Sequence, residues 1–160
     1  MKVVVIGATG TIGKALVTAL GGRHELIRVT RKLGIKVDIE DSRSIKQLFE
    51  NVKPIDAVVC CAGRTVFRPL PQLTDDEPMA GGAAISMVNA GLEGFVLGAS
   101  VEMPRSLRVN VVNPPWISET LKALDMDPSL GITAAAAAKA YVAAIEGNYN
   151  GQTLDARKFV

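Results

Sequence analysis

The chain has 160 residues, a length typical of one domain with a single substantial core, so we expect one domain over residues 1–160. Hydrophobic residues make up 48% of it and aromatic residues only 4%, which calls for an aliphatic core. The formal net charge of +2 is too small to indicate a nucleic acid or an anionic membrane as a partner. The apolar run at the start, residues 3–6, is too short for a signal peptide or a membrane span. The two cysteines, Cys60 and Cys61, lack metal-ligand spacing and are typical of reduced, buried residues of a cytoplasmic protein.

The first part of the chain alternates strands with helices. A continuous β-branched run at residues 3–6 predicts a strand that is buried on both faces. Apolar residues then recur at helical spacing, and this pattern ends at Gly21 and Gly22. Further strands are predicted at residues 25–30, 35–39 and 56–61, and helices at residues 11–20 and from Asp41 or Ser42 to just before Pro54.

The second part of the chain continues the pattern after a loop rich in proline and glycine. The predicted elements are a loop over residues 64–82, a helix over 83–101, a strand over 107–112, a helix capped by Thr133 that runs to about Glu146, and a last strand over 152–154. Strands that alternate with helices favour an α/β fold with a Rossmann-like, doubly wound parallel sheet.

A glycine-rich loop joins the first predicted strand to the first predicted helix. Gly7, Gly10 and Gly13 allow the backbone to turn tightly, to approach a pyrophosphate and to pack the helix against the strand. The start of the helix offers free N–H groups and the positive end of the helix dipole. The loop therefore predicts a dinucleotide phosphate site, to which Thr9, Thr11 and Ile12 also contribute.

The end of the second predicted strand carries cations where a protein that prefers NAD usually carries an acid. Arg31 and Lys32 stand there, and their charges favour the 2′-phosphate of NADP over the free ribose hydroxyl of NAD. The alternative interpretation is an exposed basic turn.

With these residues in view, the chain resembles the short-chain dehydrogenases/reductases over nearly its whole length. Residues 7–13 are similar to the family's glycine motif, residues 60–63 (Cys-Cys-Ala-Gly) to the segment that closes its fourth strand, and residues 109–117 to its sixth strand and the turn beside the nicotinamide. The resemblance implies that Asp38 and Ile39 contact the adenine, and that the Ile117 backbone meets the carboxamide. By the same resemblance, Cys61, Ala62, Gly63 and Pro114 also belong to the cofactor site.

Two departures from the family concern its chemistry. The family uses a Tyr and, four residues later, a Lys on one helix, but Ile85 and Asn89 occupy these positions here. Isoleucine cannot donate a proton and neutral asparagine cannot lower the pKa of a phenol, so we assign no catalytic residue. A strand and a helix that precede this segment in the family are also missing. Either the gene has lost this unit or the sequence omits a segment. The loss either leaves strand edges unpaired or brings the fourth and sixth strands together.

These observations leave three hypotheses for function. The first is an NADP-preferring oxidoreductase that acts on a small carbonyl or alcohol. The second is a catalytically degenerate NAD(P)-binding sensor, and the third is a shortened subunit that depends on a partner. In the family, the helix that corresponds to residues 83–101 and the missing helix make the dimer contact, which implies either a homo-oligomer or an unstable monomer.

The remaining polar and aromatic residues are not assigned to catalysis or metal binding. We expect His24 to be solvated, and Cys61 not to act as a nucleophile because no histidine is placed to activate it. The acidic segment 75–77 is expected to be solvated, so no metal site is predicted. Trp116 either lines the nicotinamide side of the site or covers the core.

Overall fold

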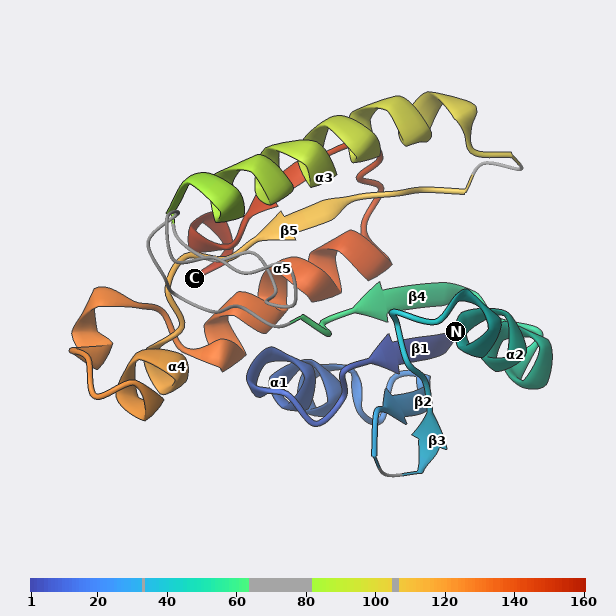
Figure 1. Cartoon of the computed structure of the whole chain (residues 1–160), viewed down its shortest axis with the longest axis horizontal. Helices are drawn as coiled ribbons and strands as arrows, with labels where there is room; N and C mark the ends of the chain where they lie inside the picture. The colour runs from blue at the N-terminus through green and yellow to red at the C-terminus, as the bar shows by residue number, and fades with distance from the viewer. Residues whose placement is uncertain (33, 64–81, 105–106) are drawn as a thin grey trace. The chain divides into compact units, whose positions relative to one another are not determined.

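The computed structural model describes residues 1–32, 34–63, 82–104 and 107–160 (Figure 1). These residues form two compact units. The first comprises residues 1–62, 114–147 and 155–160, and the second comprises the described residues of 63–113 together with 148–154.

A parallel four-stranded sheet in the order β3-β2-β1-β4 forms the centre of the first unit. Its strands are β1 (Lys2–Ile6), β2 (Glu25–Thr30), β3 (Ile35–Lys36) and β4 (Ala57–Cys60). The helices of the first unit are α1 (Thr11–Leu20), α2 (Ser42–Val52), α4 (Ser118–Ala123) and α5 (Ala134–Glu146), with short 3-10 turns at Pro128–Leu130 and Ala156–Phe159. This is the order of the first four strands of a Rossmann fold, which confirms the predicted fold class.

The central strand β1 is buried on both faces, as its β-branched run predicts. Val3 and Val5 pack with α1 and α5 on one face of the sheet. Val4 and Ile6 pack with Val29 and with residues of α2 on the other face. These four aliphatic side chains are fully or nearly fully buried. Their burial supplies much of the hydrophobic stabilisation around the loop that follows the strand.

The second unit contains the long helix α3 (Gly82–Glu102) and a two-stranded sheet of β5 (Val111–Asn113) and β6 (Thr153–Asp155). Strand β5 is shorter than the predicted strand at residues 107–112. The reason is that asparagine side chains replace part of the backbone ladder: the Val109 N–H donates to Asn150 Oδ1 and the Gln152 N–H to Asn110 Oδ1, both at 3.1 Å. Backbone bonds flank this exchange: the Gly151 N–H donates to the Val109 carbonyl at 2.8 Å, and the Val111 N–H donates to the Gln152 carbonyl at 3.0 Å.

Strand β4 lies at an edge of the four-stranded sheet, while β5 belongs to a separate sheet. Within the first unit, the described residues place no further strand beside β4. Burial alternates along β4, and Val58 remains 44% exposed. Among the described residues, no helix has the length and apolar character that crossing a bilayer requires.

Candidate nucleotide-binding site

Gly7 begins the turn that leaves β1 and can only be glycine. Its φ is +82°, and a Cβ at this position would lie 2.7 Å from the backbone nitrogen of Ala62. The Gly7 and Ala8 N–H groups both donate to the Val29 carbonyl, at 2.9 and 3.2 Å. The turn therefore runs tightly against the carboxyl ends of β2 and β4.

Gly13 brings α1 into contact with this turn. A Cβ on Gly13 would overlap the carbonyl oxygen of Gly7 and lie 3.1 Å from the Ala8 Cα. Gly10 is less restricted, with 3.3 Å between its would-be Cβ and the same Gly7 oxygen. Two of the three glycines are thus required by close backbone approach, as the motif predicts.

The first turn of α1 offers hydrogen-bond donors to a ligand. Its N-cap residue, Gly10, has no side chain to accept a hydrogen bond from the helix. The first intrahelical bond runs from the Lys14 N–H to the Gly10 carbonyl at 2.9 Å. The N–H groups of Thr11 and Ile12 find no acceptor in the described part of the chain. Such a helix start, with no acidic residue in its first turn, suits a phosphate group.

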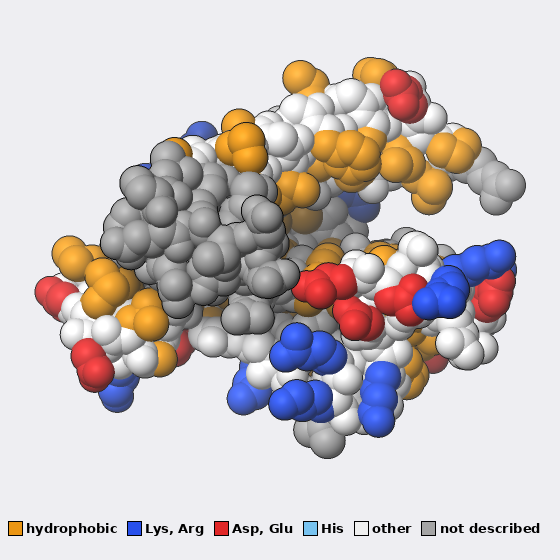
Figure 2. Space-filling view, viewed as in Figure 1, with side chains coloured by type: hydrophobic (Ala, Val, Ile, Leu, Met, Phe, Trp, Pro, Cys, Tyr) orange, Lys and Arg blue, Asp and Glu red, His pale blue; other side chains and the backbone are white. Residues whose placement is uncertain are grey.

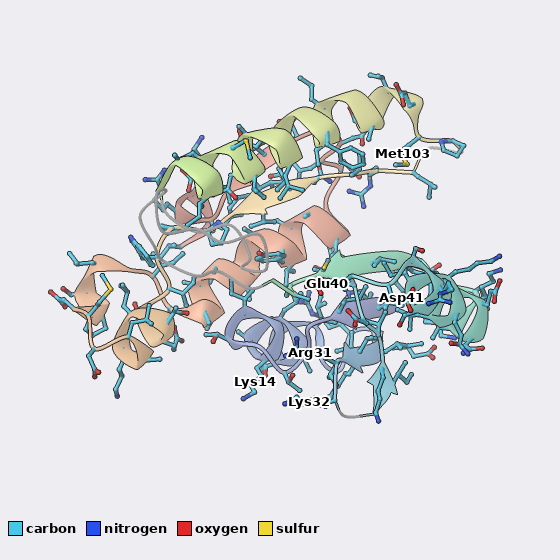
Figure 3. The ribbon with its side chains drawn as sticks, in the orientation of Figure 1. Lys14, Arg31, Lys32, Glu40, Asp41 and Met103 are labelled. Carbon is cyan, nitrogen blue, oxygen red and sulfur yellow. The ribbon has the colours of Figure 1, made fainter. Side chains whose placement is uncertain are left out.

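Three cationic side chains accompany this helix start. Lys and Arg side chains gather on one face of the first unit (Figure 2), and Figure 3 labels three of them as Lys14, Arg31 and Lys32. All three are exposed, and none forms an ion pair with another described residue. Lys14 was not predicted as a site residue. Its position in the first turn of the helix that follows the glycine loop was the signal that could have identified it.

Asp38 and Ile39 lie in the connection between β3 and α2. The Asp38 carboxylate accepts a hydrogen bond from the Glu40 N–H at 3.0 Å, and the Asp38 N–H donates to Ser44 Oγ at 2.9 Å. Ile39 is 42% exposed. The connection is thus held in one conformation, with both predicted adenine contacts outside the core.

The cysteines at the end of β4 differ from each other. The Cys61 side chain packs against the core, and burial, with a smaller effect from Cys60, raises the pKa of its thiol to about 12. The predicted burial of both cysteines is wrong for Cys60, which is exposed because alternate side chains of this edge strand point away from the core. The Cys61 N–H donates to the Ile6 carbonyl at 2.8 Å, so Ala62 is held against Gly7. Gly63 belongs to the second unit.

Ile117 is the N-cap residue of α4, a helix that the sequence analysis did not predict. Its carbonyl accepts hydrogen bonds from the N–H groups of Thr120 and Leu121, both at 2.9 Å. Pro114 precedes it at the start of this segment of the first unit, and Trp116 is 44% exposed. The Ile117 backbone can therefore offer its N–H group to a ligand, whereas its carbonyl already accepts hydrogen bonds within α4.

Ile85 and Asn89 both lie on α3, in the second unit. No side chain at these two positions can exchange a proton with a substrate oxygen. Across the ranges that the structure describes, no three His, Cys, Asp or Glu side chains gather into a possible metal site. The acidic segment 75–77 lies outside the described residues.

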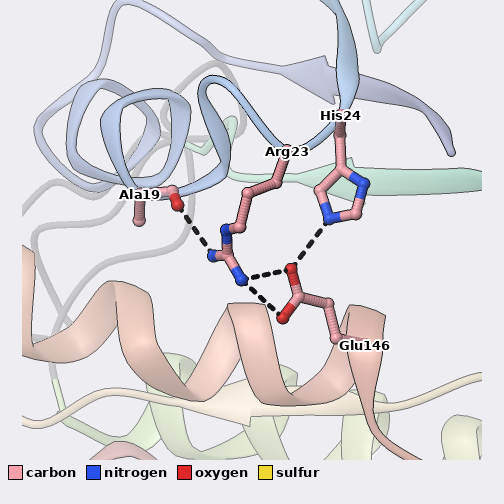
Figure 4. Close-up of polar contacts among 4 residues, drawn as sticks. All are labelled: Ala19, Arg23, His24 and Glu146. Carbon is pink, nitrogen blue, oxygen red and sulfur yellow. Dashed lines mark hydrogen bonds and ion pairs between the residues drawn. The ribbon is translucent and has the colours of Figure 1, made fainter.

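His24 is not solvated, contrary to expectation. Its side chain is only 10% exposed, and its Nε2 lies 2.8 Å from Glu146 Oε1 at the end of α5 (Figure 4). Arg23 binds the same carboxylate at 2.8 Å and donates to the Ala19 carbonyl. The His24 hydrogen bond, followed by Arg23, lowers the pKa of Glu146. The cluster connects the turn before β2 to α5 and belongs to the stability of the unit.

The glycine loop and the first four strands match a known sequence family. The model of the NAD dependent epimerase/dehydratase family matches residues 3–70. A comparison with curated protein sequences finds no match.

Solved structures resemble the chain over most of its length. The protein lin1944 from Listeria innocua is 28% identical, with a TM-score of 0.88 over 97% of this chain and 98% of its own. A small-chain dehydrogenase in complex with NADPH is 18% identical, with a TM-score of 0.77 over 97% and 95% of the two chains. A short-chain dehydrogenase from Leptospira borgpetersenii with bound NAD+ is also 18% identical, with a TM-score of 0.78 over 96% and 90%.

The chain is a short α/β protein with the Rossmann-like fold of the short-chain dehydrogenases/reductases, as its motifs predicted. Its glycine loop occupies the place that a dinucleotide-binding loop has in that fold.

Proposed function

We propose that the chain binds a nicotinamide dinucleotide at the glycine loop and prefers NADP to NAD. The observation that carries this proposal is the start of α1, where free backbone donors accompany Lys14, Arg31 and Lys32. Pyrophosphate fits the donors and the tight Gly7 turn, and a 2′-phosphate fits the three cations, which have no anionic partner among the described residues. The bound NADPH and NAD+ of similar structures support the general class of ligand.

The proposed contacts follow the elements that surround the loop. Asp38 and Ile39 would face the adenine, and the backbones of Ala62, Gly63, Pro114 and Ile117 would line the nicotinamide end, with Cys61 behind them. When bound, the cofactor supplies hydride transfer. The chain itself would bind the phosphates and orient the adenosine.

The leading function is therefore that of an NADP-preferring oxidoreductase for a small carbonyl or alcohol. A second candidate, a dinucleotide-binding sensor without turnover, is favoured by Ile85 and Asn89, which cannot form the Tyr–Lys pair. We also propose that the protein is cytoplasmic, in keeping with its two free cysteines. We propose further that its single-domain subunits form a homo-oligomer and that it has no nucleic acid or membrane partner.

A fluorescence titration with NADPH tests the binding proposal, which fails if no binding is seen at millimolar concentration. Oxidation of NADPH by a panel of small carbonyls then separates the two candidates. Turnover that Asn89→Ala abolishes would establish the enzyme, whereas binding without turnover across the panel would establish the sensor.

A further inference from the structure

We infer that Glu119 is a positioning residue for the nicotinamide end of the proposed site. Its carboxylate joins α4 to α5 and so fixes the backbone around Ile117, whose N–H then meets a hydrogen-bond acceptor of the ligand. This inference rests on the proposed function, because it assigns a further residue to the same site.

The Glu119 carboxylate binds the start of α5. Both of its oxygens accept from the Ala134 N–H, at 2.9 and 3.1 Å. Ala134 is the first residue of α5 and is only 4% exposed, and the first turn of α5 contains no acidic residue of its own. The N-cap residue Thr133 binds a different donor, the Ala136 N–H. Glu119 therefore satisfies a donor that Thr133 leaves open, and it brings negative charge to the positive end of the helix dipole.

The backbone just before Glu119 is paired with the backbone just before α5. The Ser118 N–H donates to the Ile132 carbonyl at 2.8 Å, and the Ile132 N–H donates to the Trp116 carbonyl at 2.9 Å. These two bonds form an isolated parallel bridge between Ile117 and Ile132. The bridge and the Glu119 carboxylate thus hold the same two segments together at successive positions.

This arrangement leaves one backbone donor of the segment open. The bridge uses the groups of the residues on either side of Ile117, so the N–H and the carbonyl of Ile117 take no part in it. The carbonyl accepts the N–H groups of Thr120 and Leu121, whereas the N–H finds no acceptor in the part of the chain that the structure describes. Ile117 is only 6% exposed. A donor on so buried a residue favours an acceptor that a ligand supplies, such as the carboxamide oxygen of the nicotinamide.

Loss of the Glu119 carboxylate affects this donor and not the phosphate donors. The Ala134 N–H then lacks its acceptor, so the bridge alone ties the start of α4 to the start of α5. The Ile117 N–H becomes less well ordered, and its hydrogen bond to a ligand weakens because more freedom is lost on binding. The donors at the start of α1 belong to a different element and keep their geometry.

Two ligands test the inference: NADPH, and 2′-phospho-ADP-ribose, which lacks the nicotinamide. Each is titrated by calorimetry into the natural chain and into Glu119→Ala. We expect the variant to bind NADPH about fivefold more weakly and 2′-phospho-ADP-ribose unchanged, because about one neutral hydrogen bond is lost at the nicotinamide end alone. An equal loss for both ligands, or a loss for neither, overturns the inference while the dinucleotide site stands. If the natural chain binds neither ligand, the proposed function is wrong and the inference fails with it.

Three further variants separate positioning from general loss of structure. In Glu119→Gln the amide oxygen still accepts the Ala134 N–H, so the affinity for NADPH should stay within about twofold of that of the natural chain. Asp127→Ala is the matched control, since Asp127 also caps a helical turn between α4 and α5, but through the Ser129 N–H at 2.9 Å. A loss specific to NADPH in this control, or a Glu119→Gln variant that behaves as Glu119→Ala, overturns the inference. Glu119→Asp, whose carboxylate is one methylene shorter, replaces Glu119→Ala with the same expectation if circular dichroism shows that Glu119→Ala is unfolded.

Discussion

The carbonyl oxygen of Gly7 occupies the space that a Cβ on Gly13 would need. This close approach lies between the end of β1 and the first turn of α1, so a side chain at residue 13 would push the helix start away from the turn. The geometry of the proposed phosphate site therefore depends on the absence of one methyl group.

Gly13→Ala is expected to lower the free energy of unfolding by about 3 kcal/mol, because the methyl group overlaps backbone that cannot shift freely. Gly10→Ala is the graded control: its Cβ meets the same oxygen at 3.3 Å, and the free energy of unfolding should fall by only about 1 kcal/mol. Urea denaturation followed by circular dichroism measures both. Equal stability of the two variants would show that the Gly7–Gly13 contact is not limiting.

Glu146→Gln is expected to lower the melting temperature at neutral pH, because it removes the carboxylate shared by His24 and Arg23. The pKa of Glu146 is lower in the folded chain than in the unfolded chain. Its stabilising effect is therefore complete above the ordinary carboxyl pKa of about 4.3 and disappears as the pH falls through the lowered value.

Thermal melts at several pH values check the sign of this effect. The gap between the natural chain and Glu146→Gln should close in acid. Glu50→Gln provides the control, since Glu50 is an exposed residue 4.0 Å from Lys46 and should change the melting temperature little. A gap that widens in acid would contradict the assignment.

Iodoacetamide is expected to modify one of the two thiols of the native protein quickly. Cys60 is exposed, whereas Cys61 is packed in the core and its pKa is raised to about 12, so little thiolate forms there. Mass spectrometry of peptides after a timed reaction measures both sites. Cys60→Ser should remove the fast modification, and rapid labelling of Cys61 in the native protein would disprove its burial.

Sedimentation is expected to show an oligomer. Helix α3 carries several large apolar side chains with high exposure: Met87, Leu92, Phe95, Leu97 and Val101. Phe95→Glu should shift the population toward monomer, because a charge at this 63% exposed position opposes apolar association. Glu102→Gln, on the same helix, is the control. A monomeric natural chain that unfolds cooperatively would contradict this prediction.

Local patterns were sufficient for much of the fold. Helix α1 and strand β2 have the predicted bounds, and Thr133 caps α5 through the Ala136 N–H at 3.1 Å as expected. These elements follow from side-chain periodicity and from capping residues that act within a few positions. The roles of Gly7 and Gly13 also followed from spacing, because the strand and helix around them were correctly placed.

Other features depended on contacts that no local pattern contains. His24 and Glu146 are 122 positions apart, so the sequence around His24 gave no sign of its burial. The exposure of Cys60 follows from its place on an edge strand, which its apolar sequence context does not reveal. Helix α4 is only six residues long and follows a double proline, so its periodicity was too brief to detect.

The packing of β1 against α5 also bears on synthesis of the chain. Val3 and Val5 leave the ribosome more than a hundred residues before Ala138 and Ile145, which complete the same core. One face of the nascent sheet therefore stays incompletely covered until α5 has been made, and exposed apolar strands are prone to aggregate. This protein should thus depend on chaperones more than one whose core forms from neighbouring segments.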